Sequence, residues 1–143
     1  MMRAVYETRT EDETIALGAD LARSWSLPAV VLLIGNLGAG KTTLAKGIAE
    51  GLGVTRRDEV SSPTFPLIHE YGDPGQLAHV DLYRLDTIEE VESLGLDETI
   101  ASTEVTLLEW AERFPQLMPR QRIEIRIEAH DDESRSIVVT EHA

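Results

Sequence analysis

One segment constrains the fold of this chain more than any other feature, and it reads Gly35-Asn36-Leu37-Gly38-Ala39-Gly40-Lys41-Thr42. It matches the pattern G-x-x-x-x-G-K-[ST]. The residues before it, Ala29 to Ile34, are continuously apolar, as in a strand buried on both faces. Apolar residues then recur at helical spacing over residues 42–52. A strand, a glycine-rich turn and a helix in this order predict an α/β domain with a P-loop.

The residue types in this segment suit a bound phosphate chain. Glycines let successive backbone N–H groups point at phosphate oxygens, and the Lys41 ammonium adds a point charge for the β- and γ-phosphates. The Thr42 hydroxyl can ligate Mg²⁺, and the helix N-terminus adds positive potential. We therefore expect ATP with Mg²⁺ as the ligand. The predicted nucleotide-binding residues here are Gly35, Asn36, Leu37, Gly38, Ala39, Gly40, Lys41, Thr42 and Thr43.

The rest of the pattern predicts a single domain over residues 1–143 with a mixed sheet. Further strands are expected at residues 5–8, 65–71, 77–83, 105–109, 122–129 and 136–140, and helices at 11–26 and 87–102, the second broken near Gly95. Turn residues at 72–75 and 131–134 predict two hairpins, so the sheet is partly antiparallel. Thr10 is most simply the N-cap of the first helix, and we also count it among the candidate nucleotide-binding residues.

Two carboxylates end predicted strands, Asp81 after Leu77 to Val80 and Glu109 after Val105 to Leu108. The Glu109 strand is the more apolar and is expected to be the more central. Mg²⁺ on a nucleotide needs a carboxylate opposite the P-loop hydroxyl. Asp81 and Glu109 are therefore candidate metal ligands with Thr42, and candidate catalytic residues with Lys41. One would orient a Mg²⁺-bound water and the other the attacking water; alternatively, each is a solvated strand-end carboxylate.

Other residues leave two interpretations open. Ser61-Ser62-Pro63-Thr64-Phe65 reads as a Ser-Pro turn or as a switch-like segment in which Thr64 senses the γ-phosphate. Arg84 either reaches a phosphate or pairs with a carboxylate. Trp110 is interpreted as a packing residue. The histidines show no metal-ligand spacing and are interpreted as surface or strand residues.

Composition narrows the function classes. The chain has 13 basic and 26 acidic residues, a net charge of −13, so direct nucleic-acid binding is not expected. The absence of cysteine excludes disulfides and thiolate metal sites. The longest apolar run is Ala29 to Ile34, far short of a membrane span, and the N-terminus has no apolar signal region. We expect a cytoplasmic location and no membrane contact.

Four ordered motifs together resemble the TsaE family. They are residues 35–44, Ser62-Pro63-Thr64-Phe65, His79-Val80-Asp81-Leu82-Tyr83-Arg84 and Leu107-Leu108-Glu109-Trp110-Ala111-Glu112. The resemblance covers residues 10–119 and implies a P-loop NTPase-type three-layer α/β fold with a mixed, partly antiparallel central sheet. Members of this family are small bacterial ATPases needed to make threonylcarbamoyladenosine at position 37 of tRNAs that read ANN codons.

The resemblance also implies roles and partners. Thr42 and Glu109 would hold Mg²⁺ with Asp81 beside them, and Thr64 would lie on a switch segment. The partners would be the TsaD and TsaB proteins, with TsaD performing the transfer, ATP hydrolysis resetting the complex, and tRNA reached only indirectly. The family usually has Asp where this chain has Asn36. Hydrolysis is expected to be weaker here if that carboxylate is catalytic or linked to Mg²⁺, and unchanged if it only caps the loop.

Three alternative functions are a small-molecule P-loop kinase, a GTP switch and a non-hydrolysing regulatory subunit. A small-molecule P-loop kinase needs an acceptor pocket and an arginine-bearing lid, and Arg113, Arg120 and Arg122 lie in a short, proline-punctuated stretch. A GTP switch of the N-K-x-D type is excluded because Asn36 is the only asparagine. A non-hydrolysing regulatory subunit stays open; it would return bound ATP unchanged after long incubation with the partners.

Overall fold

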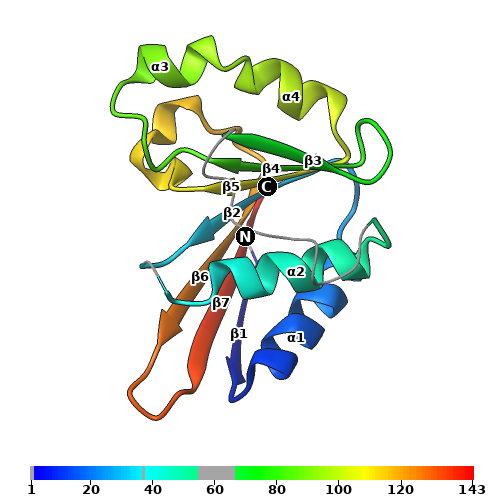
Figure 1. Ribbon diagram of the computed structural model, residues 1–143, viewed down its shortest axis with the longest axis vertical. Helices are drawn as coiled ribbons and strands as arrows, with labels where there is room; N and C mark the ends of the chain where they lie inside the picture. The colour runs from blue at the N-terminus through cyan, green and yellow to red at the C-terminus, as the bar shows by residue number, and fades with distance from the viewer. Residues whose placement is uncertain (1, 37, 55–66) are drawn as a thin grey trace.

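A computed structural model describes residues 2–36, 38–54 and 67–143, and its strands form a seven-stranded mixed sheet with helices on both faces (Figure 1). The sheet order is β1-β7-β6-β2-β5-β4-β3. The strands are β1 (Met2–Thr8), β2 (Ala29–Ile34), β3 (Ile68–Tyr71), β4 (Leu77–Asp81), β5 (Val105–Glu109), β6 (Arg122–Ala129) and β7 (Arg135–His142). The helices are α1 (Glu11–Ser24), α2 (Lys41–Gly51), α3 (Ile88–Ser93) and α4 (Leu96–Ser102), with short 3₁₀ turns η2 (Ala111–Arg113) and η3 (Pro115–Leu117).

The centre of the sheet is parallel and its two sides are antiparallel. Strand β2 pairs parallel with β5 and β6, and β4 pairs parallel with β5. The β3–β4 and β6–β7 hairpins are antiparallel, as predicted, and β1 pairs antiparallel with β7. Parallel strands end at the same edge, so the carboxyl ends of β2, β4 and β5 meet there. The prediction that the Glu109 strand is more central than the Asp81 strand is confirmed.

Each face of the sheet has its own core, which gives three layers. On one face, Leu33 and Leu107 pack with Leu44 and Ile48 of α2, and Leu21 of α1 joins them. On the other face, the buried residues Leu32, Val80 and Leu108 pack with Val91 of α3 and Leu96 of α4, among others. Because strand side chains alternate, the odd-numbered residues of β4 and β5 face α2.

Several element ends differ from those predicted. Strand β1 begins at Met2 rather than Val5 because it pairs with β7 from Met2 to Thr8. Helix α1 ends at Ser24 rather than Ser26, since the buried Trp25 has an extended backbone. The expected break at Gly95 is confirmed and lies between α3 and α4. In the part of the chain that the structure describes, no helix has the length and apolar character needed to cross a membrane.

Candidate nucleotide-binding site

The glycine-rich loop joins the end of β2 to the start of α2. Gly38 and Gly40 have φ angles of +81° and +112°, a region that residues with a Cβ rarely adopt. The Asn36 carbonyl accepts from the Ala39 N–H at 3.0 Å, and Gly40 caps α2. The first N–H groups of α2 therefore begin at the loop and are oriented for an anion. Leu37 lies outside the described residues.

Lys41 is buried beside this loop, with 5% of its surface exposed. Its Nζ lies 3.9 Å from Glu109 Oε1 and 4.0 Å from the centre of the Trp110 ring. Within the described residues, Nζ makes no hydrogen bond. The ammonium therefore has an opposite charge nearby and still has all its N–H groups available to an acceptor.

The two predicted carboxylates lie directly opposite each other. Asp81 and Glu109 are register partners at the ends of β4 and β5, and both face the α2 side of the sheet. They are 7% and 3% exposed, so the alternative that they are solvated strand ends is wrong. Asp81 Oδ1 accepts from the Tyr83 N–H at 2.9 Å, which holds the carboxylate at the strand end.

His79 belongs to the same cluster, and the interpretation from sequence missed this role. Its side chain is fully buried, and its Nε2 lies 2.5 Å from Glu109 Oε2. The signal was available: His79 precedes Asp81 by two residues on a strand, so the two side chains share a face.

Trp110 also does more than pack. It packs against the core on the α3–α4 side, as interpreted, but its φ of +65° turns the chain directly after Glu109. Its ring lies 5.0 Å from the half-exposed Tyr83 ring and beneath the Lys41 ammonium. Trp110 therefore makes a cation–π contact with the buried Lys41 ammonium.

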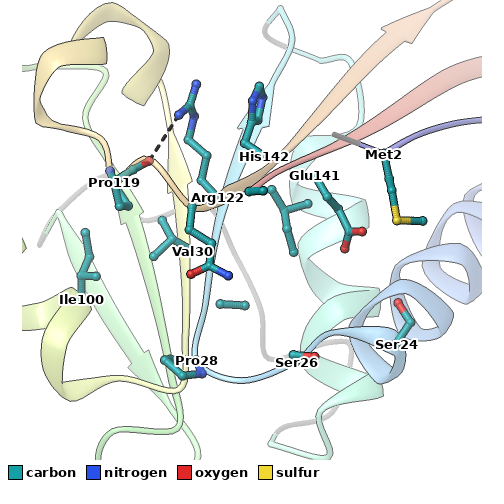
Figure 2. A pocket seen from close by; sticks show the side chains of 14 residues that line it. Met2, Ser24, Ser26, Pro28, Val30, Ile100, Pro119, Arg122, Glu141 and His142 are labelled. Atoms are coloured by element: carbon teal, nitrogen blue, oxygen red, sulfur yellow. Dashed lines mark hydrogen bonds between the residues drawn. The ribbon is translucent and has the colours of Figure 1, made fainter.

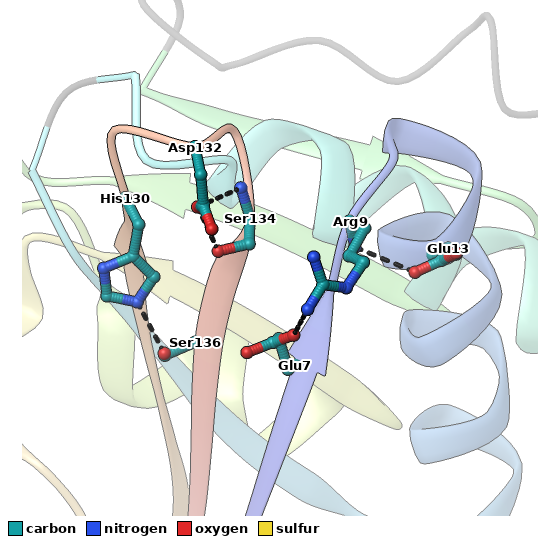
Figure 3. A network of polar contacts seen from close by, with 7 residues as sticks. All are labelled: Glu7, Arg9, Glu13, His130, Asp132, Ser134 and Ser136. Atoms are coloured by element: carbon teal, nitrogen blue, oxygen red, sulfur yellow. Dashed lines mark hydrogen bonds and ion pairs between the residues drawn. The ribbon is translucent and has the colours of Figure 1, made fainter.

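Arg135 was not predicted, although it contacts the loop. Its Nε donates to the Ala39 carbonyl at 2.8 Å from the first residue of β7. The preceding turn is held by Asp132, which accepts from the Ser134 hydroxyl at 2.6 Å and backbone N–H at 3.1 Å (Figure 3). These hydrogen bonds from Ser134 lower the pKa of Asp132. The turn thereby places Arg135 against the glycine-rich loop.

Thr10 is the N-cap of α1, as expected, and accepts from the Glu13 N–H at 3.0 Å. Glu13 in turn accepts from the Arg9 N–H at 2.8 Å, and Figure 3 shows this contact. The end of β1 also lies near the loop, because Thr8 is the register partner of Arg135. A contact of Thr10 with nucleotide stays a prediction. Thr64 and its segment lie outside the described residues.

The site residues open onto one cavity of about 450 Å³. It is lined by the loop and by side chains that include Lys41, Thr42, Asp81, Arg84, Glu109 and Arg135. Thr43 also lines it. A larger cavity of about 560 Å³ lies elsewhere, at the start of β2 and β6 (Figure 2). There Arg122 donates to the Pro119 carbonyl at 3.3 Å and to Glu124 at 2.8 Å. The Arg122 guanidinium is therefore already paired with a carboxylate of the protein.

The acidic pair alone is not a complete metal site. Over residues 2–36, 38–54 and 67–143, no group of three or more His, Asp or Glu side chains is arranged to hold an ion. Thr42, Asp81 and Glu109 supply oxygen donors around one cavity, and oxygen donors are what Mg²⁺ prefers. The remaining ligands would have to come from phosphate and water, which is how nucleotide-bound Mg²⁺ is held.

The arginines considered for a kinase lid have structural contacts. Arg113 donates to the Leu82 carbonyl at 3.0 Å and also to the Leu85 carbonyl, which ties η2 to the segment after β4. Arg122 is paired with Glu124, as described above. Two of the three arginines are therefore used inside the fold, which does not favour the kinase alternative.

Comparison with known proteins identifies the family of this mixed-sheet α/β protein with a glycine-rich loop. A family model described as "Threonylcarbamoyl adenosine biosynthesis protein TsaE" matches residues 8–137. A TsaE protein of Bacillus subtilis is 43% identical over 142 residues, covering 98% of this chain and 87% of the relative. One of Treponema pallidum is 36% identical over 138 residues, covering 96% and 99%. The chain therefore belongs to the TsaE family.

A solved structure supports the same relationship. The crystal structure of Bacillus subtilis YdiB superposes with a TM-score of 0.79 at 37% sequence identity. The match covers 99% of this chain and 87% of the other. The mixed sheet and its flanking helices are thus shared across nearly the whole length of the chain.

Proposed function

We propose that this chain is a P-loop NTPase-type, Mg²⁺-dependent ATP-binding and ATP-hydrolysing protein that serves threonylcarbamoyladenosine formation at position 37 of tRNA. The observation that carries the proposal is the buried Lys41 ammonium, which faces a cavity shared with Thr42, Asp81 and Glu109. The names of the relatives, all tRNA threonylcarbamoyladenosine biosynthesis proteins, supply the pathway. A cytoplasmic location is part of the same proposal.

The electrostatics favour a phosphate ligand. Buried charges are normally paired and hydrogen-bonded, yet Lys41 Nζ lies 3.9 Å from its carboxylate, beyond hydrogen-bond distance. A phosphate oxygen near the N-terminus of α2 would complete its hydrogen bonds and add a favourable interaction with the helix dipole. The phosphate would thus be bound by Lys41 and by backbone N–H groups of the glycine-rich loop.

Thr42, Glu109 and Asp81 would hold the Mg²⁺ that accompanies the nucleotide. The ion stabilises developing negative charge on the phosphoryl oxygens. Glu109, fixed by His79, would present an oxygen to the ion or to its water. Asp81, fixed by the Tyr83 N–H, would orient the attacking water and accept its proton. The exposed Asn36 lacks the charge of the family's usual Asp. Hydrolysis would be weaker if that carboxylate is catalytic or linked to Mg²⁺, and unchanged if it only caps the loop.

We assign TsaD and TsaB as the protein partners, with tRNA reached only through the complex. A net charge of −13 repels a polyphosphate backbone over most of the surface. Such a chain acts on tRNA modification more readily through basic or tRNA-binding subunits than directly. ATP hydrolysis would then change its affinity for those subunits and permit repeated turnover.

The Lys41→Ala variant tests the site. Loss of a charge-assisted contact of about 1.5–3 kcal/mol should weaken ATP binding roughly 10- to 100-fold, with thermal unfolding unchanged. Lys46→Ala is the matched control, because it removes the other lysine from the same helix and should leave binding unaffected. Equilibrium binding of ATP and phosphate release measure the outcome. Wild-type affinity and turnover in Lys41→Ala would refute the proposal.

A further inference from the structure

The two oxygens of Glu109 have different neighbours. Oε2 lies 2.5 Å from His79 Nε2, whereas Oε1 lies 3.9 Å from Lys41 Nζ. All three side chains are buried, with exposures of 0% for His79, 3% for Glu109 and 5% for Lys41. A buried row of three polar groups thus connects strand β4, through the end of β5, to the first residue of α2.

The contacts at the two ends of this row differ in kind. An ionised carboxylate only accepts, so the His79 Nε2–H donates to Glu109 Oε2. The opposite ring nitrogen, Nδ1, has no partner in the described part of the chain. Glu109 is therefore the anchor of the imidazole there. The Lys41 contact is longer than a hydrogen bond and needs no fixed orientation, so it can be exchanged.

We propose that His79 is a positioning residue that fixes Glu109 through Oε2. Oε1 would then contact Lys41 when the site is empty and the nucleotide-bound Mg²⁺ when nucleotide binds. The inference rests on the proposed function. When a phosphate oxygen binds the Lys41 ammonium, the buried Glu109 carboxylate loses the interaction with its neighbouring cation. The His79 hydrogen bond then keeps the carboxylate from rotating, and Oε1 faces the cavity. A partner of this kind behind a metal ligand is worth about 10- to 100-fold in metal affinity.

The test measures ADP binding as a function of Mg²⁺ concentration, with no catalytic turnover. His79→Gln places its amide N–H near the position of Nε2, whereas His79→Asn places it near Nδ1 and leaves Glu109 without a donor. We expect Asn to raise the Mg²⁺ concentration for half-maximal ADP binding about 10-fold or more, and Gln to stay near wild type. ADP affinity in EDTA should be the same in all variants, since the loop and Lys41 are intact.

His69→Gln is the matched control. His69 is the register partner of His79 on β3 and contacts Tyr71, not Glu109. The His69→Gln variant should therefore have the same Mg²⁺ requirement for ADP binding as wild type. Equal Mg²⁺ requirements for His79→Gln and His79→Asn would overturn the inference. If Lys41→Ala still weakens nucleotide binding in that case, the proposed function stands; if Lys41→Ala binds normally, the proposed function itself fails.

A second measurement needs no substitution in the measured protein. In ¹⁵N-labelled wild type, the His79 Nε2–H proton should give a slowly exchanging downfield signal, because it is fully buried and hydrogen-bonded to Glu109. Its absence from a folded His79→Gln preparation that keeps the other slowly exchanging signals assigns it. We expect it to persist when Mg²⁺ and ADP are added together. Its loss on that addition would overturn the inference, since Glu109 would then leave His79.

Discussion

Lys41 is a buried cation at the start of α2, beside the glycine-rich loop. Its ammonium has a carboxylate at 3.9 Å on one side and the Trp110 ring at 4.0 Å on another. A charge pair and a cation–π contact offset part of the cost of desolvation. Neither contact uses a hydrogen bond, so a phosphate does not have to displace one. Within the described residues, the N–H groups of the ammonium are therefore still available to an acceptor.

The two carboxylates can be separated by substitution. We expect Glu109→Gln to raise the Mg²⁺ requirement for ATP binding about 10-fold or more, because it removes the anionic oxygen beside Lys41. Asp81→Asn should lower turnover more than ATP affinity, because an amide cannot accept the proton of an attacking water. Mg²⁺ titrations of ATP binding and single-turnover hydrolysis measure the two effects. Normal binding and normal hydrolysis in both variants would show that neither carboxylate serves the reaction.

At the scale of elements, helices α1 and α2 approach closely at glycines. A Cβ built on Gly47 would lie 2.1 Å from the Ile15 carbonyl oxygen of α1, and one on Gly18 would lie 2.6 Å from the Leu44 carbonyl. Both neighbours are backbone atoms, which cannot rotate out of the way. Because α2 begins with Lys41 and Thr42, this packing also sets the position of the glycine-rich loop.

We therefore expect Gly47→Ala to destabilise the fold by about 1–3 kcal/mol and to weaken ATP binding as α2 is pushed from α1. Chemical denaturation and equilibrium binding measure the two effects. Lys46→Ala, one residue earlier on the same helix, is the control and should change neither. Unchanged stability in Gly47→Ala would contradict the close packing of the two helices.

Helix α3 has an acid-sensitive N-terminus. Glu90 closes a capping box with Thr87 and also accepts from the backbone N–H of Asp86 at 3.0 Å. The backbone N–H of Asp86, and then that of Thr87, lower the pKa of Glu90. A lowered pKa in the folded state means that the ionised cap stabilises at pH values above the ordinary pKa of glutamate. That stabilisation is lost as the pH falls through the lowered value.

Hydrogen exchange at the Val91 amide, which bonds to the Thr87 carbonyl, should therefore accelerate, relative to its intrinsic rate, as the pH falls below the ordinary pKa of glutamate. Glu90→Gln should have weaker protection at neutral pH and should lose this acid dependence. The carboxyl of Asp132 also has a lowered pKa, and this group is unchanged in Glu90→Gln, so it serves as the internal control. An identical pH profile for wild type and Glu90→Gln would contradict the role of the cap.

At the scale of the whole molecule, one end of the sheet carries the site. The carboxyl ends of β4 and β5, the glycine-rich loop after β2, the start of α2 and the start of β7 all contribute residues to one cavity. Helices α3 and α4 lie on the opposite face of the sheet from α2 (Figure 1). A nucleotide bound at this end would lie where a protein partner could sense it without contacting the core.

We expect three results together in reconstitution with TsaD, TsaB and tRNA. The isolated protein hydrolyses ATP slowly; its binding to the TsaD–TsaB pair depends on ATP; and repeated rounds of modification fail in Thr42→Ala or Glu109→Gln, while a single round survives. Pull-down with and without ATP, and counts of modified tRNA per complex, measure these outcomes. Full-rate multiple turnover without this protein, or with Lys41→Ala, would rule out the proposed role even if ATP binding were confirmed.

The sequence alone determined the features whose signals are local. The strand, glycine turn and helix around Lys41 follow from an apolar run, required glycines and helical spacing within about twenty residues. Both hairpins and the break at Gly95 follow from turn residues. The pairing of Asp81 with Glu109 was predictable as well, because each ends an apolar strand, and parallel strands end at the same edge of a sheet.

Only the tertiary structure decided which distant residues complete the site. Arg135 reaches the Ala39 carbonyl across 96 residues of sequence, and His79 reaches Glu109 across 30. The Trp110 ring lies under Lys41, and the Trp110 backbone has a positive φ. A tryptophan in the sequence gives no signal for this backbone conformation. These contacts depend on strand order, register and the alternation of side chains across paired strands. Such pairings are set by the packing of the whole sheet, and no short stretch of sequence encodes them.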